Sequence, residues 1–243
     1  MARLARFRQL APRDVNHTVW KGHNGEWIFK SDRHKEAYLK DMDELAADAG
    51  FNLFSFCIMN NHDHEIDQPD SVNDYSTLYH NLHSRHAQRY NKDMKRTGAV
   101  GNGRPFTTVV QDDEHFMTAM LYLDANPVRA GIVKHAKHYR WGSYNHYAYG
   151  KTGPGTKAIV HPDWYIRLGR TNKLRQKAYR CLFDAYLRRE GMLPKPGLCS
   201  KHYFGGNEWV ERRRMRAQQQ VWMPLPTPTG DTPPTGDADL DTS

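Results

Sequence analysis

The sequence predicts an α/β protein of the α+β kind: a small, mostly antiparallel, ferredoxin-like or palm-like sheet with helices packed on it. Two observations predict this class. Strand-like and helix-like segments alternate through the first half of the chain, and each helix-like segment carries its apolar residues on one side. A length of 243 residues is enough for one such domain with a sizeable core and a smaller helical extension.

Three strand–helix pairs make up the predicted domain. The first strand is expected at 16–20, and a helix follows from Asp32, a typical N-cap residue, to about Ala49. Gly50 is a natural stop for that helix. The next segment, 51–59, is short, aromatic and apolar, which predicts a central strand buried on at least one face.

The second and third helices flank another strand. A long helix is expected over 73–95, and the β-branched run 107–110 predicts the strand after it. Asp112 or Asp113 then opens the third helix. Because a proline comes next, Asn126 is the expected last residue of that helix.

The composition changes along the chain. From Tyr165 to Arg216 there are fourteen Lys or Arg against four Asp or Glu, with helical stretches near 171–190 and 206–219. Aromatic side chains at helical spacing there are expected mainly to pack, with base stacking as the alternative. We therefore expect four parts: a catalytic domain 1–147, a linker or loop 148–164, a basic helical extension 165–220 and a disordered acidic tail 221–243.

Charge favours a polyanionic partner. The formal net charge is +8, although the last 23 residues hold four Asp and no Lys or Arg. The rest of the chain is therefore more basic than the total indicates, which favours binding to nucleic acid through phosphate contacts.

Compartment follows from cysteine usage and hydropathy. The three cysteines lack the close pairing of a zinc knuckle or disulfide framework, which predicts reduced thiols. No segment approaches the roughly eighteen-residue apolar run that spans a bilayer. The expected location is the cytoplasm, in association with the nucleoid.

Two histidines follow the apolar strand directly, in the order His62-Asp63-His64. Residues i and i+2 of an extended chain point to the same face, so both imidazoles can bind one divalent cation. Such a triplet is often incidental, and it gains meaning only with partner groups.

Tyr122 and Asn126 are candidate partners. A spacing of four places them on one side of the third helix, beside its apolar stripe. The alternative is ordinary: a helical tyrosine usually packs, and an asparagine before proline commonly ends a helix.

Five segments resemble the REP-associated tyrosine transposases, which are single-tyrosine HUH enzymes, in the family's order and at plausible spacing. The most specific contains Tyr-Leu-Asp-Ala-Asn-Pro-Val-Arg-Ala-Gly. The resemblance covers roughly residues 10–147, and Tyr165 to Leu187 is more weakly similar to the C-terminal extension of some members. The segments are Phe56 to His64, Leu82 to Asn91, Gly103 to Phe106, Leu121 to Val133 and Tyr139 to Tyr144.

The resemblance implies a role for each matched residue. His62 and His64 are the implied metal ligands and Tyr122 the nucleophile, and Asn126 occupies the position of a third ligand. The implied reaction is metal-dependent cleavage and strand transfer of single-stranded DNA at REP-type hairpins, through a 5′-phosphotyrosine intermediate. Mn²⁺ or Mg²⁺ is the expected metal, and two imidazoles suit Mn²⁺ better.

Nucleic-acid contacts and oligomeric state are further expectations. A monomer is expected rather than a dimer, although related insertion-sequence enzymes exchange tyrosine helices in dimers. The candidate phosphate contacts are the basic region 165–216 and arginines near the N-terminus, on the long helix and within the matched segments: Arg3, Arg6, Arg8, Arg85, Arg89, Arg104 and Arg129.

The sequence departs from the family pattern at the triplet. Its middle residue is usually hydrophobic, but here it is Asp63, and Glu65 and Asp67 follow. A buried central strand should not carry unpaired carboxylates, so Asp63 and Asp67 are expected at an exposed edge or paired with Arg or Lys.

Three alternatives remain. The first is a catalytically impaired DNA-hairpin-binding protein of the same fold. The second is a metal-dependent hydrolytic nuclease or RNA-processing enzyme in which water attacks and Tyr122 only packs. The third is a replication or conjugation initiator, disfavoured because no helicase or other large partner domain is present.

Overall fold

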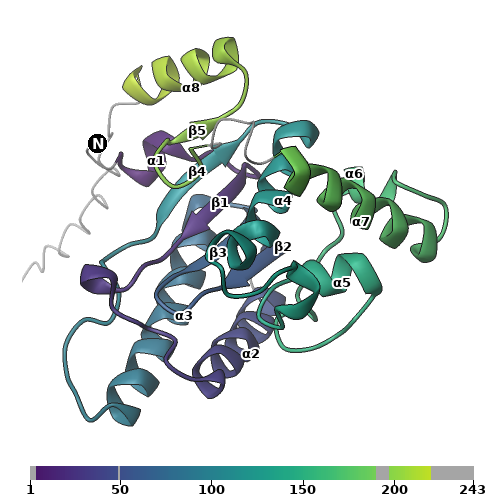
Figure 1. Ribbon diagram of the computed structural model, residues 1–243. Coiled ribbons are helices and arrows are strands. Elements are labelled where there is room, and N and C mark those ends of the chain that lie inside the picture. Colours follow the sequence, from purple (N-terminus) through teal and green to yellow (C-terminus); the bar gives the residue numbers. More distant parts are fainter. Residues whose placement is uncertain (1–3, 49, 190–196, 220–243) are drawn as a thin grey trace, which may run out of the picture.

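A computed structural model describes residues 4–48, 50–189 and 197–219 (Figure 1). A five-stranded sheet in the order β2-β3-β1-β4-β5 forms its centre. The first three neighbouring pairs are antiparallel and β4 pairs with β5 in parallel, so the predicted mostly antiparallel α/β class is confirmed. The strands are β1 (Val15–Val19), β2 (Phe51–Ile58), β3 (Asp63–Pro69), β4 (Phe106–Val110) and β5 (Tyr203–Phe204).

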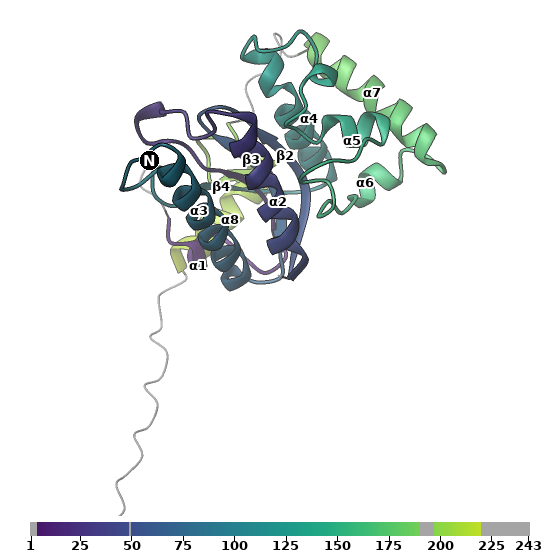
Figure 2. The ribbon, with the colours of Figure 1, turned by 90° about the horizontal axis from the view of Figure 1, so that it is seen from below.

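The helices cover both faces of this sheet. Helices α2 and α3 pack together under β2 and β3, and α4 crosses the opposite face (Figure 1). Helices α5, α6 and α7 gather beside α4 at one end of the sheet (Figure 2). The helices are α1 (Arg6–Gln9), α2 (Asp32–Asp48), α3 (Val72–Asp93), α4 (Asp113–Arg129), α5 (Tyr144–Tyr149), α6 (Asp163–Ile166), α7 (Asn172–Arg189) and α8 (Asn207–Gln219), with single 3-10 turns at His23–Gly25 and Ala136–His138.

Helix starts agree with the capping residues of the sequence. The Asp112 side chain accepts a hydrogen bond from the His115 backbone N–H, which fixes the start of α4. Ser71 does the same for α3 through the N–H of Asp74. Helix α2 begins at Asp32, so the N-cap was predicted one residue too late: the Ser31 side chain accepts from the His34 backbone N–H at 3.3 Å.

The end of α4 differs from the expectation. The helix continues through Pro127 to Arg129 instead of ending at Asn126. Proline removes one backbone donor, but it does not end this helix, and two side chains add hydrogen bonds to the last turn. Asn126 Nδ2 and Arg129 Nη2 both donate to the Tyr122 carbonyl, at 3.3 and 3.1 Å.

The two carboxylates expected at an edge or beside a cation are inside the sheet. Strand β3 lies between β2 and β1, and Asp63 and Asp67 are both 0% exposed. Neither expected arrangement is present: tyrosine, threonine and asparagine side chains and a backbone N–H hold them. Neutral donors suffice because burial raises both carboxyl pKa values to about 7.

Parts of the chain after residue 164 pack on the sheet. Strand β5 lies beside β4, and α8 contacts both β5 and α1. Helix α7 is attached to α4 by a buried hydrogen bond of 2.5 Å from Tyr179 Oη to Asp124 Oδ2. Tyr165, Tyr179 and Tyr203 are buried, so the expectation that aromatic residues here mainly pack is confirmed for them.

Candidate active site

Strand β3 presents opposite chemistry on its two faces. Asp63, Glu65 and Asp67 point toward α2 and α3, where Tyr38 and Tyr79 donate to them. The alternate residue His64 points toward α4. The period of a strand therefore separates the imidazoles from the carboxylates.

Three histidines meet on the α4 side. His17 of β1 is stacked on His64, with ring centroids 5.1 Å apart. His62, immediately before β3, stands edge-on to His64 at 4.7 Å. His17 and His64 are buried, and His62 is partly exposed.

Hydrogen bonds fix the protonation of these rings. The Leu198 carbonyl can only accept, so His17 Nδ1 donates to it at 2.9 Å. Burial lowers the pKa of His17 to about 4, so the ring is neutral and its Nε2 accepts from His64 Nδ1 at 2.9 Å. The Nε2 lone pair of His64 is then left for a ligand.

His62 has the same tautomer by a different route. Its Nδ1 lies 2.6 Å from Asn61 Oδ1, an amide oxygen that accepts. Burial, with the positive charge of Lys21, lowers the pKa of His62 to about 4. Both histidines of the triplet thus carry an unprotonated Nε2 at neutral pH.

Tyr122 of α4 lies against this cluster. Its ring is perpendicular to those of His17 and His64, with centroids 6.4 Å away in each case. The Arg129 guanidinium lies 3.7 Å above the Tyr122 ring, and Tyr122 Oη is 3.9 Å from Cys199 Sγ. Burial raises the pKa of the Tyr122 phenol to about 12, with Cys199 acting in the same direction and Arg129 against it.

Asn126 is held on the same helix by Arg129. Its Oδ1 accepts from Arg129 Nη2 at 2.7 Å, while its amide group donates to the Tyr122 carbonyl. The oxygen keeps a second lone pair. Its role as a third ligand stays a prediction.

The donor set fits a divalent cation in part. His62 and His64 supply two nitrogen donors on neighbouring rings. Within 4–48, 50–189 and 197–219, no group of three His, Cys, Asp or Glu residues is placed to hold a metal. Any further ligands would have to be an amide oxygen, water or phosphate oxygens of a substrate, all of which Mg²⁺ and Mn²⁺ accept.

The candidate arginines are dispersed. Arg129 lies at Tyr122, whereas Arg85 and Arg89 of α3 pair with the carboxylates of Asp41 and Glu44 on α2. Arg6, Arg8 and Arg104 lie around α1, where Arg6 and Arg104 line one cavity and Arg8 another. Arg3 lies outside the described residues.

Sequence reasoning missed His17, Leu198 and Cys199. A histidine in a predicted strand was a signal for the first, but only the strand order places β1 beside β3. Leu198 acts through its backbone carbonyl and Cys199 approaches from far along the chain. No local pattern marks either of them.

Comparison with known proteins gives little at the level of sequence. No protein-family model matches the chain, and no curated protein matches it. One solved structure with a similar course of the chain is described as "Structure of the REP associates tyrosine transposase bound to a REP hairpin". It is 14% identical, with a TM-score of 0.49, and the match covers 67% of this chain and 99% of the other. The functional argument therefore rests on the residues of the site.

Proposed function

We propose that this protein is a metal-dependent single-stranded DNA endonuclease and strand transferase that acts on REP-type hairpins, with Tyr122 as nucleophile. The observation that carries the proposal is the position of Tyr122 against His64, which stands beside His62, with the Nε2 atoms of both histidines unprotonated. A tyrosine with only a packing role would not need neighbouring histidines whose Nε2 lone pairs can bind a metal.

The reaction follows from these groups. Tyr122 Oη attacks phosphorus, an O–P bond forms, and the bond to the 3′ oxygen breaks, leaving a 5′-phosphotyrosine and a free 3′-hydroxyl that takes a proton. With a pKa of about 12, only about one phenol in a hundred thousand is ionised at pH 7. Arg129 over the ring favours the phenolate.

His62 and His64 are the proposed metal ligands, with Asn126 as a candidate third. A divalent cation bound there, Mn²⁺ or Mg²⁺, would polarise the scissile phosphate and favour the phenolate. The residues themselves orient that site: His17 holds the ring of His64, and Asn61 holds the ring of His62.

The chief alternative is a hairpin-binding protein with an impaired metal site. It rests on Asp63, the unusual middle residue of the triplet. The Asp63 side chain points away from the imidazoles and accepts from Tyr38 Oη at 2.6 Å and the Trp20 N–H at 2.8 Å. This arrangement supports the enzyme, because the substitution leaves both ligand positions on the other face.

A covalent adduct is the direct test. Wild type and Tyr122→Phe are incubated with labelled hairpin DNA and Mn²⁺, and a denaturing gel is used to detect protein–DNA adducts. We expect an adduct in wild type and in the control Tyr149→Phe, which changes an exposed tyrosine, and none in Tyr122→Phe.

The other results would select the alternatives. Cleavage that survives Tyr122→Phe would support hydrolysis by water. Binding without any adduct, on several cognate hairpins, would support the binding protein.

A monomer during the reaction is our expectation, checked by sedimentation. In the part of the chain that the structure describes, no helix is long and apolar enough to span a membrane.

A further inference from the structure

Three adjoining hollows lie around α1, between helix α3 and the segment before β5, outside the proposed active site. The largest, with a volume of about 350 Å³, is lined by Arg6 and Arg104. A small hollow shares these two arginines and extends to Leu4 and His202. The third, of about 270 Å³, shares Leu4 and His202 with the second.

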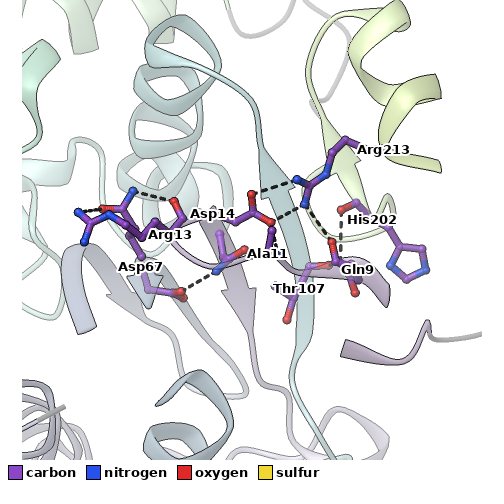
Figure 3. Close-up of polar contacts among 10 residues, drawn as sticks. Gln9, Ala11, Arg13, Asp14, Asp67, Thr107, His202 and Arg213 are labelled. Atoms are coloured by element: carbon purple, nitrogen blue, oxygen red, sulfur yellow. Dashed lines mark hydrogen bonds and ion pairs between the residues drawn. The ribbon is translucent and has the colours of Figure 1, made fainter. Parts of the chain in front are cut away.

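Neighbouring hollows share wall residues, so the three lie in a row along one surface, although the middle one has a volume of only about 10 Å³. We call this row the cationic groove. Gln9 supports its middle, because its side chain donates to the backbone carbonyls of Thr107 and His202 and so ties β4 to the segment before β5 (Figure 3). The basic residues that line it are Arg6, Arg8, His80, His83, Arg104, Lys201, His202 and Arg214.

The charged side chains that line the groove are basic. Among the described residues, no Asp or Glu lines any of the three hollows. Arg214 does pair with Glu211 on its own helix, so its charge is partly offset. An anionic occupant is therefore favoured.

Buried hydrogen-bond donors in the wall also favour an anionic occupant. The Nε atoms of Arg6 and Arg8 and the hydroxyl of Tyr203 are buried and have no hydrogen-bond partner. Buried polar groups are almost always satisfied in folded proteins, by protein, water or ligand. Phosphate oxygens, which only accept, suit guanidinium N–H donors.

The walls also contain apolar and aromatic surface between the charges. Leu4, Pro105, Phe106 and Tyr203 alternate with the basic residues. A single strand exposes its bases and can use such surface, whereas a duplex hides them.

One end of the groove adjoins the proposed active site. Lys201 lines the groove, and Cys199, two residues earlier, contacts Tyr122. Thr108 of β4 fixes the intervening turn, since its hydroxyl contacts the carbonyls of Leu198 and Lys201 at 2.8 and 2.6 Å. A strand in the groove would thus approach Tyr122 around the β4–β5 edge.

We infer that the cationic groove binds the unpaired strand of the DNA substrate through its phosphates. This inference rests on the proposed function, since it names the part of the substrate that lies outside the hairpin. It assigns Lys201 and Arg214 as contacts and separates them from Arg85 and Arg89, which lie on another surface.

The test uses labelled oligo-dT with the full chain in EDTA, so that binding is measured without cleavage. Fluorescence anisotropy gives the affinity across a range of salt concentrations. Each lost phosphate contact on a single strand should lower the slope of log affinity against log salt by about 0.7. For Arg6→Ala/Arg104→Ala we therefore expect a loss of about 1.4, and for Lys201→Ala about 0.7.

The control is Arg33→Ala/Arg140→Ala, which removes the same charge from two exposed residues outside the groove. We expect it to leave the slope unchanged, and we expect the groove variants to bind a duplex of the same length like wild type. That duplex binding also verifies that the variants are folded.

Three results would overturn the inference. They are an unchanged slope in the groove variants, an equal loss in the control, or an equal loss on the duplex, which would make the groove a general anion surface. Because no cleavage is needed, the adduct assay can fail while the groove assay succeeds, and the reverse.

Discussion

The two faces of β3 have the same backbone and opposite chemistry. On the α4 face, burial lowers the pKa of the histidines and keeps them neutral. On the α2–α3 face, burial raises the pKa of Asp63 and Asp67 to about 7, and tyrosine hydroxyls hold both carboxyls. The same desolvation thus keeps the imidazoles neutral and able to bind a metal on one face, and favours uncharged carboxyl groups that can pack on the other.

The largest effect is expected when a histidine on the α4 face of β3 is removed. His64→Ala removes a proposed ligand, and we expect adduct formation to fall by about 100-fold or more, beyond the loss typical of changes next to a metal ligand. His23→Ala, an exposed histidine, is the control and should retain wild-type rates in the gel assay. Adduct formation by His64→Ala near the wild-type rate would remove His64 from the mechanism.

His17 tests whether the hydrogen bond behind the ligand matters. His17→Leu deletes the acceptor for His64 Nδ1, and we expect Mn²⁺ affinity to fall by about 10- to 100-fold in calorimetry. His17→Gln can accept from His64 through its oxygen and donate to Leu198 through its amide group, so partial rescue is expected. Equal losses in both variants would indicate a purely steric role.

The carboxylate face should affect stability instead of chemistry. Asp67 has a pKa of about 7 in the folded protein against 3.8 ordinarily, so folding takes up a proton between these values. The free energy of unfolding therefore falls as pH rises from about 4 to 7, by up to on the order of 4 kcal/mol from this group, and then levels off.

Asp67→Asn sharpens this comparison. We expect thermal unfolding of the variant to depend less on pH between about 4 and 7 than that of wild type, with adduct formation retained. Thr18, Asn16 and Tyr79 still offer hydrogen bonds to an amide there. An identical pH dependence in both proteins would contradict the raised pKa.

The smallest effect is expected for Arg85. The side chain pairs with Glu44 at 2.9 Å and is partly exposed, so Arg85→Ala should change stability by only about 0 to 1 kcal/mol. DNA affinity should stay within about twofold in anisotropy measurements. A larger loss of affinity would support the DNA contact that the sequence indicates.

The sequence analysis correctly predicted local structure and missed long-range placement. Capping residues and apolar spacing located the helices from Asp32 and Asp112, because these signals act within a few residues. The predicted end of α4 was wrong because a proline marks a helix end only by local preference. The helix continues through Pro127 to Arg129, and the side chains of Asn126 and Arg129 add hydrogen bonds to the Tyr122 carbonyl there.

The candidate site shows the same division. His62, His64 and Tyr122 come from adjacent motifs, and the structure brings them together. His17 and Cys199 join them only through strand order and the turn before β5, which depend on the whole fold. The buried Asp63 was misplaced because its partners, Tyr38 and the Trp20 backbone, lie far along the chain.

The central claim is that Tyr122 becomes linked to a 5′ phosphate. The most direct measurement is mass spectrometry of the protease-digested adduct formed with hairpin DNA and Mn²⁺. Our account predicts one modified peptide, with the nucleotide attached through a 5′ phosphate to Tyr122. A nucleotide on another residue, a 3′-phosphate linkage, or cleaved DNA with no modified peptide would contradict it.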